Sequence, residues 1–305
     1  MIFLKPKDTI AEETAVTVGM FDGVHLGHRA LMDTLRQNAD GAKTLAFTFR
    51  LEDESESLYT MAEKERLLAA TGMDYAYLQP CTHAFMDTTR DEFILLLKNR
   101  YNVRLLAVGE DFRFGHGAQG NAAYLLQNAE QLGISVLVVP PVLYGGEKIS
   151  STRIRRLVAG GNVSEAAKML GGYYSVSGKV EQGQRIGASI SFPTANIRTV
   201  KIKPACGVYA TLTQVRGQCY GSVTNVGVRP TVSQTGQVNI ETNIFDFNGR
   251  IYDEEIVVYF VERLRGEIRF SGLDGLREQI EKDSQKAREI IQNVQKQTVY
   301  KPDTV

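Results

Sequence analysis

The first half of the chain alternates short apolar runs with longer amphipathic segments. The runs are rich in β-branched and aliphatic residues and have the length of buried parallel strands. They cover 15–18, 44–49, 75–78, 105–109 and 134–139. The segments between them carry apolar residues at helical spacing, as in 61–70, 90–99 and 122–132. This alternation predicts right-handed βαβ units on a mostly parallel sheet, which binds ligands at the carboxyl ends of its strands.

The second half of the chain has a different pattern. Between 173 and 260 the apolar positions alternate over short segments that are separated by Gly, Pro and Asn turns. These segments include 174–180, 208–213, 219–223 and 256–260. Such spacing is typical of an antiparallel barrel or sandwich. Residues 273–294 return to helical spacing, with charged residues on the opposite face, and predict a terminal helix.

A pair of glycines at 171–172 separates the two patterns. The pair follows two predicted helices, at 150–156 and 163–170. A chain of 305 residues exceeds a typical single domain, and its 43% of hydrophobic residues suffices for two cores. We therefore predict an α/β domain at 1–171 and a β domain with a terminal helix at 172–305.

Charge and cysteine usage narrow the range of functions. Lysine plus arginine and aspartate plus glutamate each number 35, so no net field favours nucleic acid as a partner. The 3 cysteines are too few and too scattered for a disulfide framework or a zinc cage, which suits a reducing compartment. The sequence shows neither a signal peptide nor a run of about 18 apolar residues. These features predict a soluble, cytoplasmic protein without a membrane anchor.

The segment 17–29 carries the first candidate chemistry. Its sequence follows Gly-x-Phe-Asp-Gly-x-His-x-Gly-His, at the point where a predicted strand gives way to a helix. Its glycines would let the backbone approach a ligand closely, and the amides that open the helix form an anion site. These glycines are Gly19, Gly23 and Gly27. His25 and His28 fall on one face of the first helical turn. The alternative is a tight turn with two surface histidines.

Two further segments of the first half carry polar groups at the ends of predicted elements. A second helix start offers hydroxyl and guanidinium groups that suit phosphate binding, unless they only cap the helix and face solvent. These residues are Ser151, Thr152, Arg153 and Arg155. Residues 108–115 place the carboxylate of Asp111 and the ring of Phe114 at a strand end. The alternative for Phe114 is a place in the core, together with Phe112.

These motifs resemble those of a known family. The histidine and glycine spacing resembles the HxGH nucleotidyltransferases, and the full set is similar to the adenylyltransferase module of the bacterial bifunctional riboflavin kinase/FAD synthetases. The resemblance implies a Rossmann-like FMN adenylyltransferase domain, with His25 and His28 as catalytic groups on the ATP phosphates. It implies Thr152 and Arg155 on the triphosphate. It also implies Asp111 and Phe114 near the flavin or the nucleotide. The nucleotide site would be lined by Gly19, Phe21, Asp22, Gly23 and Gly27.

Candidate chemistry in the second half begins at Phe192-Pro193-Thr194-Ala195-Asn196. Thr194 and Asn196 offer a hydroxyl and a carboxamide, which are hard oxygen donors suited to Mg²⁺ and nucleotide phosphates. The alternative is a proline-containing turn with local hydrogen bonds. The glycine-containing prefix 183–187 is flexible enough to fold over phosphates. Phosphorylation of a hydroxyl requires a base, and Glu241 is the candidate, unless it is a solvated strand carboxylate.

Segments of the second half occur in the order seen in riboflavin kinases. They are Phe-Pro-Thr-Ala-Asn, Cys206-Gly207-Val208-Tyr209, the Asn-Val-Gly-Val-Arg-Pro-Thr of 225–231, and Glu241 before Phe245-Asp246-Phe247. The resemblance implies an antiparallel β-barrel kinase domain in which Thr194 and Asn196 hold the metal and the phosphates. It also implies that Arg265 and Phe270 belong to a loop that closes on the flavin.

The chain departs from the family pattern at several positions. Residues 48–53 read Thr-Phe-Arg-Leu-Glu-Asp where the family usually has Thr-Phe-Asp-Pro-His-Pro. The rigid proline turn and its histidine are therefore missing on the flavin side of the first site. In the second half, Ala188, Ser191 and Asn243 stand in place of a customary arginine, glycine and histidine.

The resemblance covers nearly the whole chain and implies flavin cofactor synthesis. Riboflavin and ATP would give FMN in the second domain, FMN and ATP would give FAD in the first, and both steps need Mg²⁺. Two alternatives stay open because of the departures. The N-terminal domain could adenylylate another phosphorylated acceptor, or the protein could be a nucleotide- or flavin-binding regulator.

Overall fold

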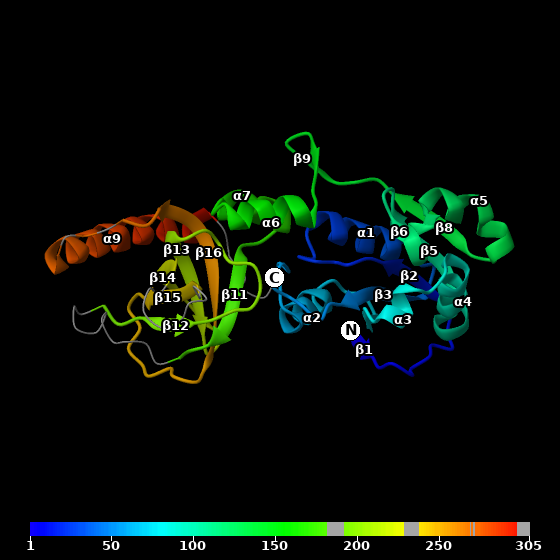
Figure 1. Ribbon diagram of the computed structural model, residues 1–305, viewed down its shortest axis with the longest axis horizontal. Helices are drawn as coiled ribbons and strands as arrows, with labels where there is room; N and C mark the ends of the chain where they lie inside the picture. The colour runs from blue at the N-terminus through cyan, green and yellow to red at the C-terminus, as the bar shows by residue number, and fades with distance from the viewer. Residues whose placement is uncertain (182–191, 229–237, 269, 271, 298–305) are drawn as a thin grey trace. The chain divides into compact units, whose positions relative to one another are not determined.

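The computed structural model describes residues 1–181, 192–228, 238–268, 270 and 272–297 (Figure 1). The chain forms two compact units. The first comprises Met1–Glu54 and Thr60–Ser151, and the second comprises Ser55–Tyr59 and Thr152–Val305. Among the described residues, none of the helices combines the length and the apolar character needed to cross a membrane.

A parallel sheet of 6 strands forms the centre of the first unit, which confirms the predicted α/β architecture. In spatial order the strands are β1 (Ile2–Leu4), β4 (Tyr75–Pro80), β3 (Lys43–Arg50), β2 (Thr14–Val18), β5 (Val103–Gly109) and β8 (Ser135–Val139). Neighbouring strands all pair in parallel. The order reverses at β2, which has β3 on one side and β5 on the other. Ligands of parallel sheets bind beyond the carboxyl ends of the strands at such a reversal.

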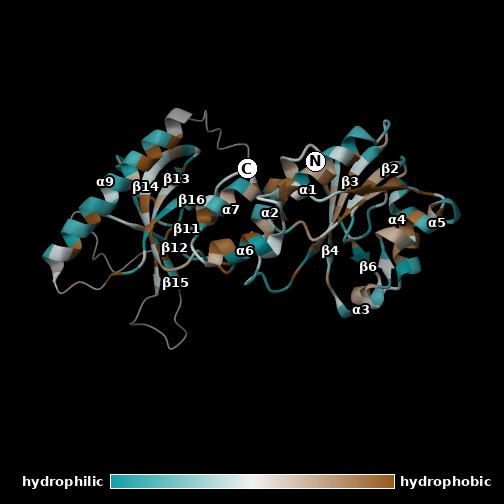
Figure 2. Ribbon diagram, turned by 90° about the horizontal axis from the view of Figure 1, so that it is seen from above, coloured by the Kyte–Doolittle hydropathy of each residue, from teal (hydrophilic) through white to brown (hydrophobic). Residues whose placement is uncertain are grey.

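Helices flank this sheet. They are α1 (Leu26–Gln37), α2 (Met61–Ala69), α3 (His83–Met86), α4 (Arg90–Tyr101) and α5 (Ala122–Leu132). Capping boxes start α2 and α4, where Thr60 and Thr89 each exchange hydrogen bonds with a glutamate. Apolar residues of α4 and α5 pack with alternate strand residues in one buried cluster, which includes Phe47, Phe93 and Leu125. The brown colour of β2 and β3 in Figure 2 marks this buried centre.

Two small hairpins follow the carboxyl ends of β5 and β8. The first pairs β6 (Arg113–Phe114) with β7 (Gly120–Asn121), and the second pairs β9 (Leu143–Tyr144) with β10 (Glu147–Lys148). Strands of two residues show no periodicity, so the apolar pattern did not predict them. The first hairpin follows β5, which neighbours β2 at the strand reversal, and the second follows the edge strand β8.

The second unit is built around an antiparallel sheet of 6 strands. In spatial order the strands are β11 (Tyr174–Lys179), β16 (Glu255–Arg265), β13 (Gly207–Val215), β14 (Gln218–Val228), β15 (Val238–Ile244) and β12 (Ala195–Ile197). A bridge joins the ends of the two edge strands, because the amide of Glu181 donates to the carbonyl oxygen of Asn196 at 2.8 Å. The sheet therefore closes into a barrel, which confirms the fold implied by the family resemblance.

Helices border the barrel. They are α6 (Ser151–Ala159), α7 (Val163–Leu170) and α9 (Leu273–Gln297). The predicted terminal helix is α9, which lies along β13 and β14 (Figure 1). Its turns alternate between teal and brown in Figure 2, as expected of an amphipathic helix. Ala287 and Ile291 of its apolar face are buried in a cluster with Val208, Phe245 and Val261 of the barrel.

The other face of the sheet holds a cluster of fully buried hydroxyl groups inside the barrel. They belong to Thr211, Thr213, Ser222, Thr224 and Thr242, each 0% exposed. Thr211 Oγ1 lies 2.7 Å from both Ser222 Oγ and Thr224 Oγ1. Thr224 Oγ1 in turn donates to Thr242 Oγ1 at 2.9 Å. Because a hydroxyl group both donates and accepts, these side chains satisfy one another without a charged partner.

A short segment from the first half of the sequence, Ser55–Tyr59, belongs to the second unit. The amide of Ile202 donates to the carbonyl oxygen of Ser57 at 3.1 Å. The ring of Tyr59 packs against that of Tyr174 with their centroids 5.7 Å apart. The second unit is therefore assembled from two separate stretches of the chain.

The main division between the units falls between Ser151 and Thr152. It follows the first residue of α6 and precedes α7. The sequence places the boundary at 171–172, directly after α7. Gly171 does end that helix, in a left-handed conformation with a φ of 73°. The boundary at this glycine stays a prediction.

Candidate active sites

The Gly-x-Phe-Asp-Gly-x-His segment forms the loop that joins β2 to α1, at the reversal of the strand order. The loop begins where the amide of Gly19 donates to the carbonyl oxygen of Phe47 at 3.1 Å. Phe21, Gly23 and Val24 then take positive φ values of 44°, 92° and 39°. A positive φ is uncommon for residues with a side chain and strained for a β-branched residue such as Val24. The loop therefore stores strain where the sequence predicts the nucleotide phosphates.

His25 and His28 lie together at the start of α1. His25 is the N-cap residue, and its Nδ1 accepts a hydrogen bond from the amide of His28 at 3.3 Å. The two rings stack with their centroids 3.6 Å apart and their planes at 15°. The ring of Phe21 meets His28 in a T-shaped contact at 5.2 Å. The structure thus brings three of the predicted site residues into direct contact.

Both histidines are neutral at physiological pH. Burial, with a smaller contribution from the positive charge of Lys148, lowers the pKa of His25 to about 4. Burial also holds the pKa of His28 well below its usual range, with contributions from His25, Lys64 and Lys148. The Nδ1 of His28 is buried without a hydrogen-bond partner among the described residues. The neutral pair can offer N–H donors to a ligand without carrying a charge.

Two glycines of the motif make room for these rings. A Cβ at Gly27 would lie 3.1 Å from Cε1 of His25, and a Cβ at Gly19 would lie 2.8 Å from Cε1 of Phe21. A side chain at either position would displace the ring beside it. The glycines are therefore required for the packing of the loop itself, whereas the sequence suggested only close approach to a ligand.

The start of α6 is fastened to the loop by Ser151. Its Oγ donates to the carbonyl oxygen of Asp22 at 2.7 Å. Thr152, Arg153 and Arg155 follow on the same helix and belong to the second unit. Nη2 of Arg155 lies 3.4 Å from Oγ1 of Thr152. The binding of these three residues to ATP phosphates stays a prediction.

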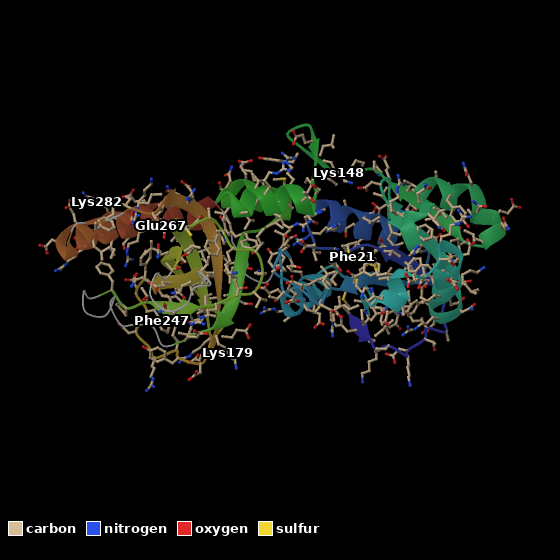
Figure 3. The ribbon with its side chains drawn as sticks, in the orientation of Figure 1. Phe21, Lys148, Lys179, Phe247, Glu267 and Lys282 are labelled. Carbon is tan, nitrogen blue, oxygen red and sulfur yellow. The ribbon has the colours of Figure 1, made fainter. Side chains whose placement is uncertain are left out.

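The segment after β5 gives Asp111 and Phe114 different surroundings. Asp111 is exposed and forms an ion pair with Lys148 of β10, which holds the pKa of the carboxyl group below its usual range. Phe114 is 8% exposed, belongs to the core cluster and stacks on Phe112 at 5.3 Å. Figure 3 labels Lys148 on the hairpin strand that precedes α6, in the same unit as Phe21. The contribution of Asp111 and Phe114 to flavin binding stays a prediction.

A row of opposed residues crosses the barrel sheet of the second unit. Asn196 of β12 pairs with Glu241 of β15, and Glu241 pairs with Asn225 of β14. Val208 of β13 and Arg265 of β16 continue the row. Directly opposed residues on antiparallel strands point to the same face of a sheet. The strand register therefore places Asn196, Glu241 and Arg265, all predicted site residues, on one face.

A cavity of about 390 Å³ lies over this face. It is lined by Phe192, Thr194, Val208, Val223, Asn225, Glu241, Asn243, Arg265, Glu267, Ile268, Phe270, Leu276, Ile280 and Asp283. Figure 3 labels Glu267 of this lining and Lys282 of α9, which belong to the same unit. Aliphatic and aromatic side chains combined with a few carboxylates and amides suit a small molecule with an apolar body and polar edges.

Hydrogen bonds orient the polar residues around this cavity. Nδ2 of Asn239 donates to Oδ1 of Asn196 at 2.9 Å and to Oε1 of Glu241 at 2.7 Å. Nδ2 of Asn243 donates to the carbonyl oxygen of Pro193 at 2.8 Å. Asn243 therefore fixes the proline-containing turn from the position where the family pattern has a histidine.

Arg265 is anchored to the terminal helix. Its guanidinium group donates to both carboxylate oxygens of Asp283 at distances between 2.7 and 3.1 Å. Gln279 of the same helix donates to Asp283 at 2.9 Å. The Cζ atom of Arg265 lies 6.0 Å from the centroid of the Phe270 ring. The two predicted flavin residues, Arg265 and Phe270, thus lie together in the cavity wall.

Two family models match this chain. The model described as FAD synthetase matches residues 7–153, and the model described as riboflavin kinase matches residues 170–291. The bifunctional riboflavin kinase/FMN adenylyltransferase of Haemophilus influenzae is 33% identical over 292 residues, which cover 92% of this chain and 94% of that protein. The chain belongs to the bifunctional riboflavin kinase/FMN adenylyltransferase family.

Further proteins are similar to this chain to a comparable degree. The protein of the same description from Escherichia coli K12 is 34% identical over 293 residues, covering 92% of this chain and 93% of that protein. The one from Bacillus subtilis 168 is 32% identical over 309 residues, covering 95% and 98%. The crystal structure of a macrolide-efflux protein from Streptococcus pneumoniae has a TM-score of 0.85 and 32% identity, covering 94% of this chain and 99% of that one. The family resemblance inferred from the motifs is confirmed.

Three residues outside the motifs of the riboflavin kinase/FMN adenylyltransferase family also contact the candidate sites. They are Lys64, Lys148 and Asn239. Lys64 lies on the face of its helix that also carries the buried Leu68, so a lysine in an apolar stripe was the available signal. Asn239 lies two residues before Glu241, and strand periodicity places both on one face. No spacing in the sequence points to Lys148.

Part of the second predicted phosphate site lies outside the described residues. This applies to 183–187, to Ala188 and Ser191, and to 229–231. The expectations for these positions stay predictions.

Proposed function

We propose that the second unit phosphorylates riboflavin with ATP to give FMN, and that the first unit adenylylates FMN with ATP to give FAD. The observation that carries this proposal is the match of one family model to each half of the chain. The cavity at Glu241 and the loop at His25 and His28 are the proposed sites of the two reactions. We expect both reactions to take place in the cytoplasm.

Glu241 is the proposed base of the kinase reaction. Its carboxylate would take the proton of the primary hydroxyl group of riboflavin while that oxygen attacks the γ-phosphorus of ATP and ADP leaves. The hydrogen bond from Asn239 supports this role because it fixes the orientation of the carboxylate. The apolar side of the cavity, with Phe192 and Phe270, would hold the flavin ring.

The donors near this base fit Mg²⁺. Among the described residues there is no group of three or more His, Cys, Asp or Glu side chains that could hold a metal ion. Thr194 and Asn196 would supply a hydroxyl and an amide oxygen, with phosphate oxygens and water as the other ligands. Mg²⁺ would neutralise the charge of the ATP phosphates. The hydrogen bond from Asn239 to Oδ1 of Asn196 keeps this oxygen in a fixed place.

In the first unit, a phosphate oxygen of FMN would attack the α-phosphorus of ATP, and pyrophosphate would leave. The neutral rings of His25 and His28 would donate N–H groups to the phosphates at the positive end of α1. Lys148 would add a positive charge, since its field already reaches both rings. Following the family resemblance, we assign the hydroxyl and guanidinium groups at the start of α6 to the triphosphate of ATP. They are Ser151, Thr152, Arg153 and Arg155.

Two single substitutions separate the proposed activities in the full-length chain. Glu241→Gln keeps the size of the side chain and removes the base, so FMN formation should fall by about 100-fold or more while FAD formation from supplied FMN is unchanged. His28→Asn removes the ring donor and should do the reverse, with a loss of about 100-fold in FAD formation. Chromatographic separation of riboflavin, FMN and FAD after incubation with ATP and Mg²⁺ measures both rates, and each variant serves as the control for the other.

Three other outcomes would contradict parts of the proposed function. A normal rate of FMN formation by Glu241→Gln would exclude Glu241 as the base. Retained ATP binding without FAD formation by the wild-type protein would favour a different acceptor, an alternative that the changed segment 48–53 motivates. A wild-type protein that turns over neither riboflavin nor FMN would favour a regulatory role.

A further inference from the structure

A buried lysine, Lys64 of α2, contacts the nucleotide loop of the first unit. The residue is 7% exposed. Its Nζ donates to the carbonyl oxygen of Met20 at 2.5 Å and to the carbonyl oxygen of Phe49 at 3.0 Å. Burial lowers its pKa to about 8, against the opposing charges of Asp22, Cys81 and Glu54. Burial of an ammonium group is unfavourable, so these hydrogen bonds must compensate for lost hydration.

The two carbonyl groups that Lys64 binds belong to different parts of the sheet edge. Met20 opens the loop after β2, whereas Phe49 lies near the carboxyl end of β3. Oγ1 of Thr48 donates to the same Met20 carbonyl at 3.0 Å. The ammonium group of Lys64 therefore ties the entrance of the loop to β3, from a helix that contributes no residue to the motif.

The loop beyond Met20 needs such fixation because its backbone is strained. Phe21, Gly23 and Val24 all have positive φ values. Conformations of this kind persist only where surrounding contacts over-determine them. The hydrogen bond from Ser151 to Asp22 holds the far side of the loop, and Lys64 holds the near side. Phe21 lies between these two points and contacts the ring of His28.

The charge of Lys64 also reaches the reacting groups. It contributes to the lowered pKa of His28. At neutral pH it adds positive potential behind the loop, where the negative phosphates of ATP are proposed to bind. The hydrogen bonds and the charge of this residue therefore act on the same place.

We infer that Lys64 is a positioning residue for adenylyl transfer, whose ammonium group holds the loop 20–24 in the conformation that places His25 and His28. This inference rests on the proposed reaction of the first unit. It extends that proposal to a residue that makes no proposed contact with ATP or FMN and acts through the loop.

The test compares Lys64→Met with Lys43→Met in the full-length chain. Methionine fills a similar volume but offers neither donor nor charge. Lys43 lies at the opposite end of β3, where its Nζ is 3.5 Å from an oxygen of Asp74. Lys64→Met should lower kcat/KM for FAD formation by about 100-fold, because displacement of reacting groups by about 1 Å has effects of that size. Both a rise in the KM for ATP and a fall in kcat are expected. Lys43→Met should leave FAD formation unchanged, and both variants should keep normal FMN formation.

Hydrogen exchange gives a second readout that does not depend on activity. The backbone amides of 19–28 should exchange about tenfold faster in Lys64→Met than in the wild-type protein. The amides of β5 should exchange at the same rate in both proteins, which shows that the first unit is folded. Lys64→Arg restores donors and charge and should recover part of the protection and part of the rate.

Wild-type rates of FAD formation in Lys64→Met would overturn the inference. A loss of rate without faster exchange in 19–28 would overturn it as well, since Lys64 would then act by a route other than the loop. A wild-type protein that forms no FAD would count against the proposed function instead. The exchange comparison would still decide whether Lys64 holds the loop.

Discussion

The histidine pair at the start of α1 combines burial with a place at the positive end of a helix. Both conditions disfavour a charged imidazole, so the rings stay neutral while they face the proposed phosphate site. A neutral pair can donate hydrogen bonds to developing charge without a change of protonation state near pH 7. Below neutral pH, the pH dependence of the first unit should therefore arise from its stability in acid.

We predict that the first unit loses stability as the pH falls below 6.5, the ordinary pKa of histidine. The folded pKa of His25 is about 4, so the unfolded chain takes up the proton first. The contribution of neutral His25 to the free energy of unfolding is fully present above pH 6.5 and is lost as the pH falls towards 4. Between about pH 7.5 and pH 5 it amounts to about 2 kcal/mol. Calorimetric unfolding of the wild type and His25→Asn at both pH values measures it, and an equal pH dependence in both proteins would contradict the prediction.

Sequence spacing predicted the site residues that act within one motif. It predicted that His25 and His28 lie together, because residues three positions apart at the start of a helix lie on the same face. The spacing did not predict Lys64, because its hydrogen bond to Met20 joins residues 44 positions apart. It did not predict Lys148 either, because the partner of this residue, Asp111, is 37 positions away. Contacts of this range depend on tertiary packing, which no local periodicity reports.

At the scale of elements, the terminal helix shapes the cavity that we propose as the kinase site. Leu276, Ile280 and Asp283 of α9 all line it. The ion pair between Arg265 and Asp283 is largely buried, with side-chain exposures of 18% and 8%. It fixes the helix to the end of β16, so the width of the cavity depends on this contact.

Asp283→Asn should raise the KM for riboflavin and lower the melting temperature of the second unit. Removal of one partner of a buried ion pair leaves the other uncompensated, at a cost of about 3 kcal/mol. Asp246→Asn is the matched control, because it breaks a more exposed ion pair with Arg288 of the same helix. Steady-state kinetics and thermal unfolding measure the two effects. An unchanged KM in Asp283→Asn would show that this contact does not shape the riboflavin site.

The long elements were predictable and the short ones were not. Strands such as β3 and β5 are buried apolar runs, and α9 has helical spacing over many turns, so the local sequence is enough to predict each of them. β12 spans only Ala195–Ile197, and the hairpin strands β9 and β10 span two residues each. Elements of this length are specified by the partners they pair with, and those partners are distant in sequence.

At the scale of the whole molecule, the chain passes from one unit to the other after Glu54, after Tyr59 and after Ser151. The short segment between the first two crossings covers a fully buried lysine. Nζ of Lys201 lies 4.3 Å from the ring centroid of Tyr59 and 4.8 Å from that of Tyr174. The second unit is therefore incomplete in any fragment that begins after Tyr59.

Of two fragments that both lack Ser55–Tyr59, the one of residues 152–305 should melt at a higher temperature than the one of residues 172–305. Only the longer fragment keeps α7, whose Val163, Met169 and Leu170 are buried. Each such side chain contributes about 1.5–3 kcal/mol when it is removed from water. Thermal unfolding of the two fragments, followed by circular dichroism, measures the difference. Equal melting temperatures would support the boundary that the sequence predicts at 171–172.

The hydroxyl cluster inside the barrel restricts how this protein can evolve. Replacement of Thr224 alone by valine would take one of two hydroxyl partners from Thr211 and from Thr242, at a cost of about 0.5–1.5 kcal/mol for each lost hydrogen bond. Replacement of every member by apolar side chains of similar shape would be nearly neutral. The two kinds of core are thus separated by intermediates less stable than either. Lineages should therefore inherit the cluster as a set or lack it entirely.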